Sequence, residues 1–370
     1  MTSTYALIVG GGTAGHVLPG VAIGQELVRR GHAADSIHFV GSDRGVERTL
    51  VPDAGFELTV LPGRGIQRKL TRDNVGALVG LGKAFASARS LLAQRTPSVV
   101  IALGGYASVP AGLWAVLRRH PIVVAEQNAV PGLANTIIGR FAKVCAVSFD
   151  GTDLPRAAWT GNPVRPEILA VADNHEQRRR EARQRFEIAD GQKLLVVFGG
   201  SLGARRINNA VVGALDHYAT RDDVVIRHII GKRDYDDVLE SIGQVPPGYI
   251  PIEYEDDMAS VYAAADLVVC RAGATSCAEL SVTGTPSVLV PLPGAPGDHQ
   301  TENARALERV GGAELVADAI FDAQMLIDTA DRLLDADGVL DTMRDSVRSV
   351  ARPDAASAVA DLVEQYGGAR

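Results

Sequence analysis

The chain has 370 residues, of which 46% are hydrophobic and 22% are charged, and its formal net charge is −7. This length exceeds what one ordinary hydrophobic core supports, so two domains are expected. The acidic balance disfavours nucleic acid as a partner. The three cysteines lack metal-ligand spacing, and no apolar run or N-terminal pattern predicts a membrane span or a signal peptide, so we expect a protein of the cytoplasm.

The charge is divided unevenly along the chain. Residues 1–163 carry 16 basic and 10 acidic residues, a balance of +6, whereas residues 164–370 carry 21 and 34, a balance of −13. A basic half in an acidic protein predicts an anionic partner for that half alone.

Short apolar runs alternate with helical segments, which is typical of parallel, doubly wound α/β sheets. Residues 160–166 contain two prolines and a glycine, which interrupt any regular element. We therefore predict domains at residues 1–163 and 164–349, with only helices after residue 322. The arginine-rich run at residues 178–183 predicts a solvated helix face. The predicted strands lie near residues 5–9, 37–40, 57–61, 98–103, 122–125, 144–148, 194–198, 224–229, 249–252, 266–270, 286–290 and 313–316.

Two near-copies of one glycine-rich segment follow two of these strands. Gly11-Gly12-Thr13-Ala14-Gly15 follows the first strand, and Gly199-Gly200-Ser201-Leu202-Gly203 follows the strand at 194–198. A strand, a glycine turn and a helix start direct backbone N–H groups and a helix dipole at one point, where an anion binds. The pair predicts two phosphate-bearing ligands. A third glycine turn, Gly104-Gly105-Tyr106, would help the first loop to cradle a diphosphate.

His16 directly follows the first glycine loop. A histidine at this position is able to reach a substrate and to titrate near neutrality, although a helix cap is the plainer interpretation. Pro19 suits the first turn of the following helix.

The same loop also fits the dinucleotide pattern G-x-G-x-x-G. An NAD enzyme needs an acidic residue at the end of the second strand. Here the first acid after that strand is Asp43, beyond its end, so the dinucleotide interpretation is the weaker one.

Further polar residues follow other strands. Glu126-Gln127-Asn128 comes after the strand at 122–125, and Arg271 comes after the strand at 266–270, with Glu279 one helical turn beyond Thr275. A carboxylate placed like that of Glu279 accepts hydrogen bonds from vicinal ribose hydroxyls. No D-x-D motif ends a strand, so we expect no metal or cofactor, and arginines with helix N-termini would neutralise a diphosphate.

Together these segments resemble the MurG-type N-acetylglucosaminyltransferases of bacterial peptidoglycan synthesis, over the whole chain. The motifs that carry the resemblance are Gly11–His16, Gly104–Tyr106, Glu126–Asn128, Gly161–Arg165, Gly199–Arg205 and Cys270–Ala274 with Glu279. Three positions differ from the residues that are frequent in this family, namely Leu202, Ala125 and Thr301. These differences leave open how the protein recognises the sugar.

The resemblance implies the GT-B glycosyltransferase fold, in which two Rossmann-like domains face a cleft. It implies inverting transfer of N-acetylglucosamine (GlcNAc) from UDP-GlcNAc to the 4-hydroxyl of the N-acetylmuramoyl group of lipid I (undecaprenyl-diphosphate-N-acetylmuramoyl-pentapeptide), which gives lipid II. The second domain would bind UDP-GlcNAc and the first lipid I. A final helix, residues 350–370, would pack back on the first domain.

The resemblance also carries roles for single positions. His16 would be the general base, with Glu126 as a second candidate or as the group that orients it. The donor side would comprise Arg165, Gly200, Ser201, Glu255, Arg271, Ala274, Glu279 and Gln300. The acceptor side would comprise Thr13, Gly15, Tyr106, Asn128 and Asn208.

A lipid acceptor requires the first domain to reach a membrane. Arg68, Lys69 and Arg72 precede a helix with the apolar residues Leu78 and Phe85. Bases beside an apolar surface predict docking on an anionic leaflet, although some of these apolar residues belong in a core. The expected location is the cytoplasmic face of the plasma membrane, with cell-division and cell-wall proteins as further partners.

Three rival functions remain open at this point. They are another GT-B transferase with a different acceptor, an NAD oxidoreductase, and a non-catalytic nucleotide-sugar-binding protein. The acceptor-side loops disfavour the first, and the second glycine loop disfavours the oxidoreductase. A binding protein would hold UDP-GlcNAc without turnover.

Overall fold

The computed structural model describes residues 4–43, 45–62, 73–200 and 203–368, apart from the side chains of residues 73–79 and 81. They form two compact units. The first comprises residues 1–165 and 352–370, and the second comprises residues 166–351.

In the described part of the chain, the first unit contains a seven-stranded parallel sheet with strand order β3-β2-β1-β4-β5-β6-β7. Its strands are β1 (Ala6–Gly10), β2 (Ile37–Ser42), β3 (Glu57–Leu61), β4 (Val99–Gly104), β5 (Ile122–Glu126), β6 (Val144–Val147) and β7 (Ala157–Trp159). Its helices are α1 (Ala14–Arg29), α2 (Glu47–Asp53), α3 (Asp73–Arg95), α4 (Ser108–Leu117), α5 (Leu133–Gly139) and α15 (Ala355–Gly367).

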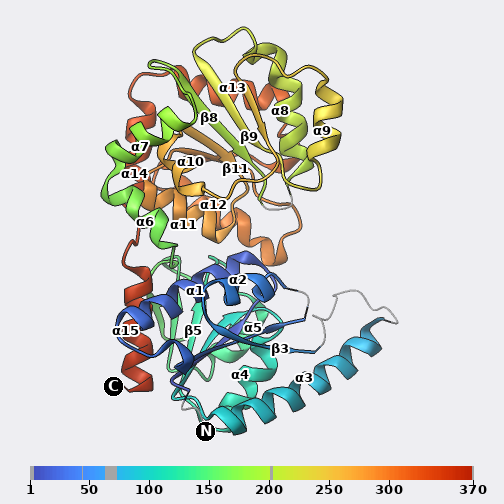
Figure 1. Ribbon diagram of the computed structural model, residues 1–370, viewed down its shortest axis with the longest axis vertical. Coiled ribbons are helices and arrows are strands. Elements are labelled where there is room, and N and C mark those ends of the chain that lie inside the picture. Colours follow the sequence, from blue (N-terminus) through green and yellow to red (C-terminus); the bar gives the residue numbers. More distant parts are fainter. Residues whose placement is uncertain (1–3, 44, 63–72, 201–202, 369–370) are drawn as a thin grey trace. The chain divides into compact units, whose positions relative to one another are not determined.

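Helices cover both faces of this sheet, because alternate residues of each buried strand point to opposite sides. Ala6 and Ile8 of β1 pack in one cluster with residues of α1, α2 and α15. Leu7 and Val9 pack in the other cluster, with residues of α3, α4 and α5. The two clusters fix β1, and with it the start of the loop that follows β1, inside the sheet between β2 and β4. On one face of the sheet, α15 lies beside α1 (Figure 1).

In the described residues of the second unit, a six-stranded parallel sheet has the order β10-β9-β8-β11-β12-β13. Its strands are β8 (Lys193–Phe198), β9 (Val224–Ile229), β10 (Tyr249–Ile252), β11 (Leu267–Cys270), β12 (Ser287–Leu289) and β13 (Ala313–Leu315). Its helices are α6 (Pro166–Asp173), α7 (His175–Arg185), α8 (Arg205–Tyr218), α9 (Tyr235–Ile242), α10 (Met258–Ala264), α11 (Ala274–Thr283), α12 (His299–Glu308), α13 (Ala323–Asp335) and α14 (Val339–Arg348). The prediction of two doubly wound parallel sheets is confirmed.

The last helix, α15, belongs to the first unit and packs on α1 and β5. Arg30, which follows α1, donates to Asp361 at 2.6 Å and to Glu364 at 2.7 Å. His32 lies 2.9 Å from the other oxygen of Glu364. These polar contacts flank the apolar residues Val359 and Val363, which are buried under the sheet.

Two local expectations were wrong. Pro19 lies inside α1, not in its first turn, because the helix already begins at Ala14. The arginine run of α7 is not wholly solvated. Arg179 and Arg183 bind Asp266 at 2.6 and 3.1 Å, and Asp266 also accepts the N–H of Leu194 at 2.7 Å, so the two arginines tie α7 to the sheet.

Among the residues that the structure describes, no helix combines the length and apolar character that crossing a membrane requires.

Candidate functional site

Both sheets reverse their strand order beside the strand that precedes a glycine loop. In the first unit the reversal lies between β1 and β4, and in the second it lies between β8 and β11. Ligands of open parallel sheets bind at the carboxyl ends of the strands at this reversal. Each unit therefore offers one candidate site, and the predicted motifs lie at both.

In the first unit, two glycine turns are packed directly on each other. A side chain at Gly105 would begin 2.4 Å from the carbonyl oxygen of Gly11, so only glycine fits there. The Ser108 hydroxyl, which the sequence analysis missed, donates to Val9 O at 2.7 Å and accepts the Gly104 N–H at 3.0 Å. The ends of β1 and β4 are thus held together as one platform.

His16 is half-buried on this platform. Its Nδ1 lies 3.0 Å from the hydroxyl of Thr13, the residue that precedes α1. Its Nε2 lies 3.3 Å from the point where a side chain at Gly104 would begin, and Asn135 Nδ2 lies 3.2 Å from the same point. If Nε2 is to accept a proton, Nδ1 must carry the hydrogen and donate it to Thr13. Gly15 is the second residue of the same helix.

Glu126 ends β5 and is 2% exposed. One carboxylate oxygen accepts the Asn128 N–H at 2.9 Å and the Asn128 side-chain amide at 3.3 Å. The other accepts the Gly132 N–H at 3.0 Å and the Asn135 amide at 2.9 Å. A carboxylate with four donors is well placed to shape the following loop, and through Asn135 it borders His16. This geometry favours the orienting role for Glu126 over that of the base.

Tyr106 is half-buried beside the second glycine turn, and its hydroxyl donates to Pro62 O at 3.3 Å. Burial raises the pKa of this phenol above its ordinary value. Tyr106 is therefore a neutral donor that joins the platform to the chain after β3.

The second unit contains a pocket of 140 Å³ at the carboxyl ends of β8, β9 and β10. It unites three predicted donor-side residues, Gly200, Glu255 and Glu279, with Tyr254 and Met258 of the adjoining segment. Whole-ligand pockets span roughly 300–1,000 Å³, so this one suits a single part of a ligand, such as a nucleoside.

Glu279 and Tyr262 are two buried residues that line this pocket. Glu279, on α11, is 4% exposed, and one of its carboxylate oxygens accepts the hydroxyl of the buried Tyr262 at 3.0 Å. The Tyr262 ring lies edge-on to Phe198, with ring centroids 6.3 Å apart. The sequence analysis missed Tyr262 and Phe198, because both resemble ordinary core residues when no contact is visible.

Both carboxylate oxygens of Glu255 are already bound within the protein, so this side chain is not placed to contact a nucleotide base. One oxygen lies 2.5 Å from Arg227, and the other accepts the N–H of Asp257 at 3.0 Å. Any contact of this segment with a base would therefore come from its backbone or from Tyr254, which is 44% exposed.

Arg271 and Gln300 both hold the segment that follows β12. Arg271 donates to Val290 O and Pro291 O, each at 3.1 Å, and pairs with Asp318 at 2.6 Å. The Gln300 side-chain carbonyl accepts the Leu292 N–H at 2.9 Å. Ala274 begins α11 and is 7% exposed, so it offers mainly its backbone. Asn303, also missed, donates to Ala272 O at 3.1 Å and supports the same region.

Asn208 lies in α8 and is 1% exposed. Its amide donates to Ile230 O at 3.2 Å, and its carbonyl lies 3.1 Å from Nε2 of His228. A side chain at Gly203 would begin 2.2 Å from the same Ile230 oxygen. The structure thus gives Asn208 a role in holding the second glycine loop, while its predicted acceptor contact stays a prediction.

Some predicted residues cannot be placed at these sites. Ser201, Arg68, Lys69 and Arg72 lie outside the described residues, as does the side chain of Leu78. Arg165 is half-buried and is the last residue of the first unit before α6. Across the described residues, no group of three or more His, Cys, Asp or Glu side chains is arranged to hold a metal ion.

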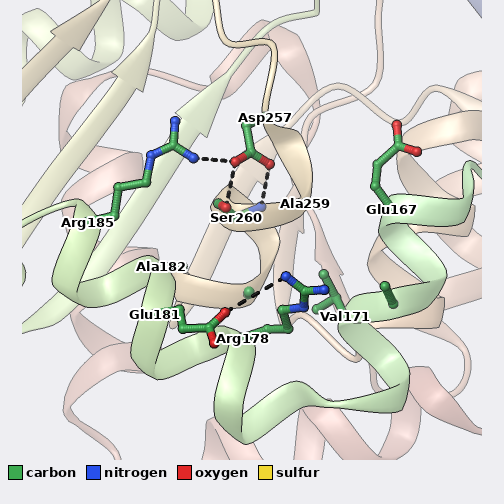
Figure 2. Close-up of a pocket in the computed structure, with 11 residues that line it drawn as sticks. Glu167, Val171, Arg178, Glu181, Ala182, Arg185, Asp257, Ala259 and Ser260 are labelled. Carbon is green, nitrogen blue, oxygen red and sulfur yellow. Dashed lines mark hydrogen bonds and ion pairs between the residues drawn. The ribbon is translucent and has the colours of Figure 1, made fainter.

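A second pocket of the second unit, of 350 Å³, lies among α6, α7 and α10. Figure 2 shows two pairs of oppositely charged side chains in it: Arg185 pairs with Asp257, and Arg178 lies 3.8 Å from Glu181. Asp257 also accepts the N–H and hydroxyl of Ser260 at 3.0 and 2.7 Å. These contacts fix the start of α10, the helix that carries Tyr262, and we assign this pocket no ligand.

Comparison with known proteins identifies the family of this chain. Residues 6–147 match the N-terminal domain of glycosyltransferase family 28, and residues 194–365 match its C-terminal domain. One relative, the UDP-N-acetylglucosamine--N-acetylmuramyl-(pentapeptide) pyrophosphoryl-undecaprenol N-acetylglucosamine transferase of Caldanaerobacter subterraneus, is 36% identical over 97% of this chain and 98% of its own length. The protein of the same name from Anaeromyxobacter is 39% identical over 96% of this chain and 91% of its own length.

The solved structures give the same answer for the fold. A crystal structure of MurG from Acinetobacter baumannii matches with a TM-score of 0.77 and 28% identity, over 98% of this chain and 99% of that one. A UDP-GlcNAc 2-epimerase from Neisseria meningitidis matches with a TM-score of 0.67 and 13% identity, over 98% and 100%, and shares the fold alone. The predicted GT-B class is confirmed, and the chain belongs to glycosyltransferase family 28, as one of its MurG-type members.

Proposed function

We propose that this glycosyltransferase moves GlcNAc from UDP-GlcNAc to the 4-hydroxyl of the N-acetylmuramoyl group of lipid I, with inversion at the anomeric carbon, and so forms lipid II. The observation that carries the proposal is the near full-length identity, 36% and 39%, with transferases named for this reaction. The geometry of both candidate sites agrees with it, since one unit offers a nucleoside-sized pocket and the other a histidine platform.

The donor side of the proposal rests on the pocket of the second unit. The Glu279 carboxylate accepts hydrogen bonds from the ribose hydroxyls, and Tyr262 fixes its orientation through the 3.0 Å bond. The diphosphate lies at the loop after β8, where Gly200 has a positive φ of 100° and leaves its surroundings open. Ser201 and Arg165 assist there and stabilise the departing UDP.

The acceptor side rests on His16. Its Nε2 takes the proton of the attacking hydroxyl, while Thr13 holds Nδ1 at 3.0 Å. Glu126 and Asn135 keep the neighbouring loop in place through their 2.9 Å bond, and Tyr106 and Asn128 contact the acceptor. A general base in this position contributes about 10²- to 10⁴-fold to the rate.

We further propose that no metal or cofactor takes part, because no D-x-D motif ends a strand in the sequence and the loop N–H groups with arginine suit a diphosphate. Turnover is expected to change less than about twofold when excess EDTA is added to the purified protein, since no step here uses a metal. A loss of activity with EDTA that Mg²⁺ or Mn²⁺ restores would contradict this.

The membrane part of the proposal places the first unit on the anionic cytoplasmic leaflet through α3 and α4. Phe85 and Arg89 of α3 line a groove with Trp114 of α4, and the Arg89 guanidinium lies 5.8 Å from the Trp114 ring centroid. Leu117, one turn beyond Trp114, is 69% exposed. Aromatic and aliphatic side chains beside basic residues suit a membrane interface.

Replacing Arg68, Lys69 and Arg72 together by alanine is expected to weaken binding to phosphatidylglycerol vesicles by about 100-fold, from about 1 kcal/mol per basic residue. Vesicle sedimentation at low and high salt measures this. Replacing Arg180, Arg309 and Arg332 of the second unit is the matched control and should have little effect. Binding that ignores both salt and the first triple substitution would refute the docking surface.

The activity itself is tested by following UDP release from UDP-GlcNAc with and without a short-chain lipid I analogue. Acceptor-dependent release is expected. Tight binding of UDP-GlcNAc without release would support the binding-protein alternative, and release with soluble sugar acceptors alone would support a transferase of other specificity.

A further inference from the structure

The first glycine loop has a carboxylate built into it. Glu47, the first residue of α2, is 1% exposed. One of its oxygens accepts the N–H of Gly12 at 2.9 Å, and the other accepts the N–H and hydroxyl of Ser42 at 2.6 and 2.7 Å. No motif of the sequence indicates this residue, which lies 35 positions from Gly12.

Three glycines make room for this carboxylate. Side chains at Gly11, Gly41 and Gly45 would begin 2.4, 2.4 and 1.8 Å from atoms of Glu47. Even the smallest side chain at these positions would displace Glu47. Gly11 of the first glycine loop therefore makes room for an internal carboxylate, as do Gly41 of β2 and Gly45 before α2.

Glu47 is held in its charged form. Burial alone would raise the pKa of this carboxyl, but the hydrogen bonds from Gly12 and Ser42 outweigh that effect and keep the pKa below its ordinary value of 4.5. A strand–glycine–helix turn ordinarily binds an external anion at its backbone N–H groups. Here, at neutral pH, the negative charge of Glu47 already lies at the Gly12 N–H.

We propose that Glu47 is a positioning residue for the acceptor side. It occupies the anion point at the Gly12 N–H, fixes the loop so that Thr13 and His16 face the acceptor, and excludes the acceptor's diphosphate from this N–H. The diphosphate is bound by other groups. The kinetic consequences rest on the proposed function, whereas the structural ones do not.

The test compares Glu47→Gln with the wild type. Glutamine keeps the size, but its NH₂ group would face an N–H donor, so the loop loses one hydrogen bond to a charged group. We expect kcat to fall by about 10- to 100-fold, with the KM for the lipid I analogue within about threefold and the Kd for UDP-GlcNAc unchanged. An unchanged kcat in Glu47→Gln would overturn the proposal, because Thr13 and His16 would then be held in place without the Glu47 carboxylate.

Asp266→Asn is the matched control. Asp266 is a largely buried carboxylate that also accepts a backbone N–H, at 2.7 Å from Leu194, but it belongs to the second unit, whereas His16 and Glu47 belong to the first. The proposal expects this variant to lose thermal stability without the selective loss of kcat. An equal loss of kcat in the two variants would mean that Glu47 affects turnover only through overall stability, and it would refute the proposal.

Hydrogen–deuterium exchange gives a readout that needs no activity. In the wild type, inorganic pyrophosphate should slow exchange in residues 199–208 but not in residues 10–16. In Glu47→Gln, exchange in residues 10–16 should rise by about tenfold or more. Protection of residues 10–16 by pyrophosphate in the wild type would contradict the inference even if the proposed reaction were absent.

Discussion

Replacing His16 by alanine is expected to lower kcat by about 10²- to 10⁴-fold while the Kd for UDP-GlcNAc stays within about twofold, because we propose the imidazole as the base on the acceptor hydroxyl. The residue lies in the first unit, 3.0 Å from the Thr13 hydroxyl, whereas the described residues that line the 140 Å³ pocket belong to the second unit. Initial rates at saturating substrates and calorimetric binding of UDP-GlcNAc measure the two quantities.

His120→Ala is the control for His16→Ala. His120 lies just before the amino end of β5, whereas His16 follows the carboxyl end of β1 in the same sheet, and Nδ1 of His120 donates to Pro97 O at 2.9 Å. Its removal should leave kcat nearly unchanged. Near-normal turnover of His16→Ala would refute the base assignment, and a large rise in the Kd for UDP-GlcNAc would move His16 to the donor side.

Replacing Glu279 by alanine is expected to raise the Kd for UDP-GlcNAc by about 10- to 100-fold, since the variant would lack the proposed hydrogen bonds between the ribose hydroxyls and this 4% exposed carboxyl group. Tyr262→Phe removes only the hydroxyl that holds Glu279 and should raise the Kd by about 3- to 10-fold. The double variant should be no worse than Glu279→Ala alone, because Tyr262 acts through that carboxylate.

Tyr218→Phe and Glu308→Gln are the matched controls for this pair. Tyr218 is buried in the second unit outside the pocket, and Glu308 is exposed on α12. Neither change should alter the Kd. Additive effects of Tyr262→Phe and Glu279→Ala would show that Tyr262 acts independently, and full retention of binding in Glu279→Ala would remove the ribose contact from the account.

The sequence predicted the sheets well because parallel strands buried on both faces form continuous apolar runs. Each predicted run overlaps a strand of the structure. The missed strand, β7, has three residues, Ala157–Trp159, with an exposed or half-buried pattern that resembles a loop. The prediction that Pro19 lies in the first turn of α1 was wrong, because the helix begins five residues earlier and tolerates this proline in its interior.

The parts of the site in which a glycine turn directly follows a strand in the chain were predictable from the sequence. The parts in which a side chain bonds to a residue far away in the sequence were not. Tyr262 reaches Glu279 across 17 positions, and Glu47 reaches Gly12 across 35. Such pairs have no local pattern, and a buried Tyr or a helix-initiating Glu is ordinary in composition. The same holds for Asp266, whose pairing with α7 turned an apparently solvated arginine run into a structural one.

The central claim is that the first unit presents the lipid-linked 4-hydroxyl to the GlcNAc of a nucleotide held by the second. The most direct measurement incubates the protein with ¹³C-labelled UDP-GlcNAc and a short-chain lipid I analogue and determines the linkage of the product by NMR. We expect one product, a lipid-linked disaccharide with a β-linkage to the muramoyl 4-hydroxyl. An α-linkage, transfer to another hydroxyl, or no lipid-linked disaccharide despite binding of both substrates would contradict the central claim.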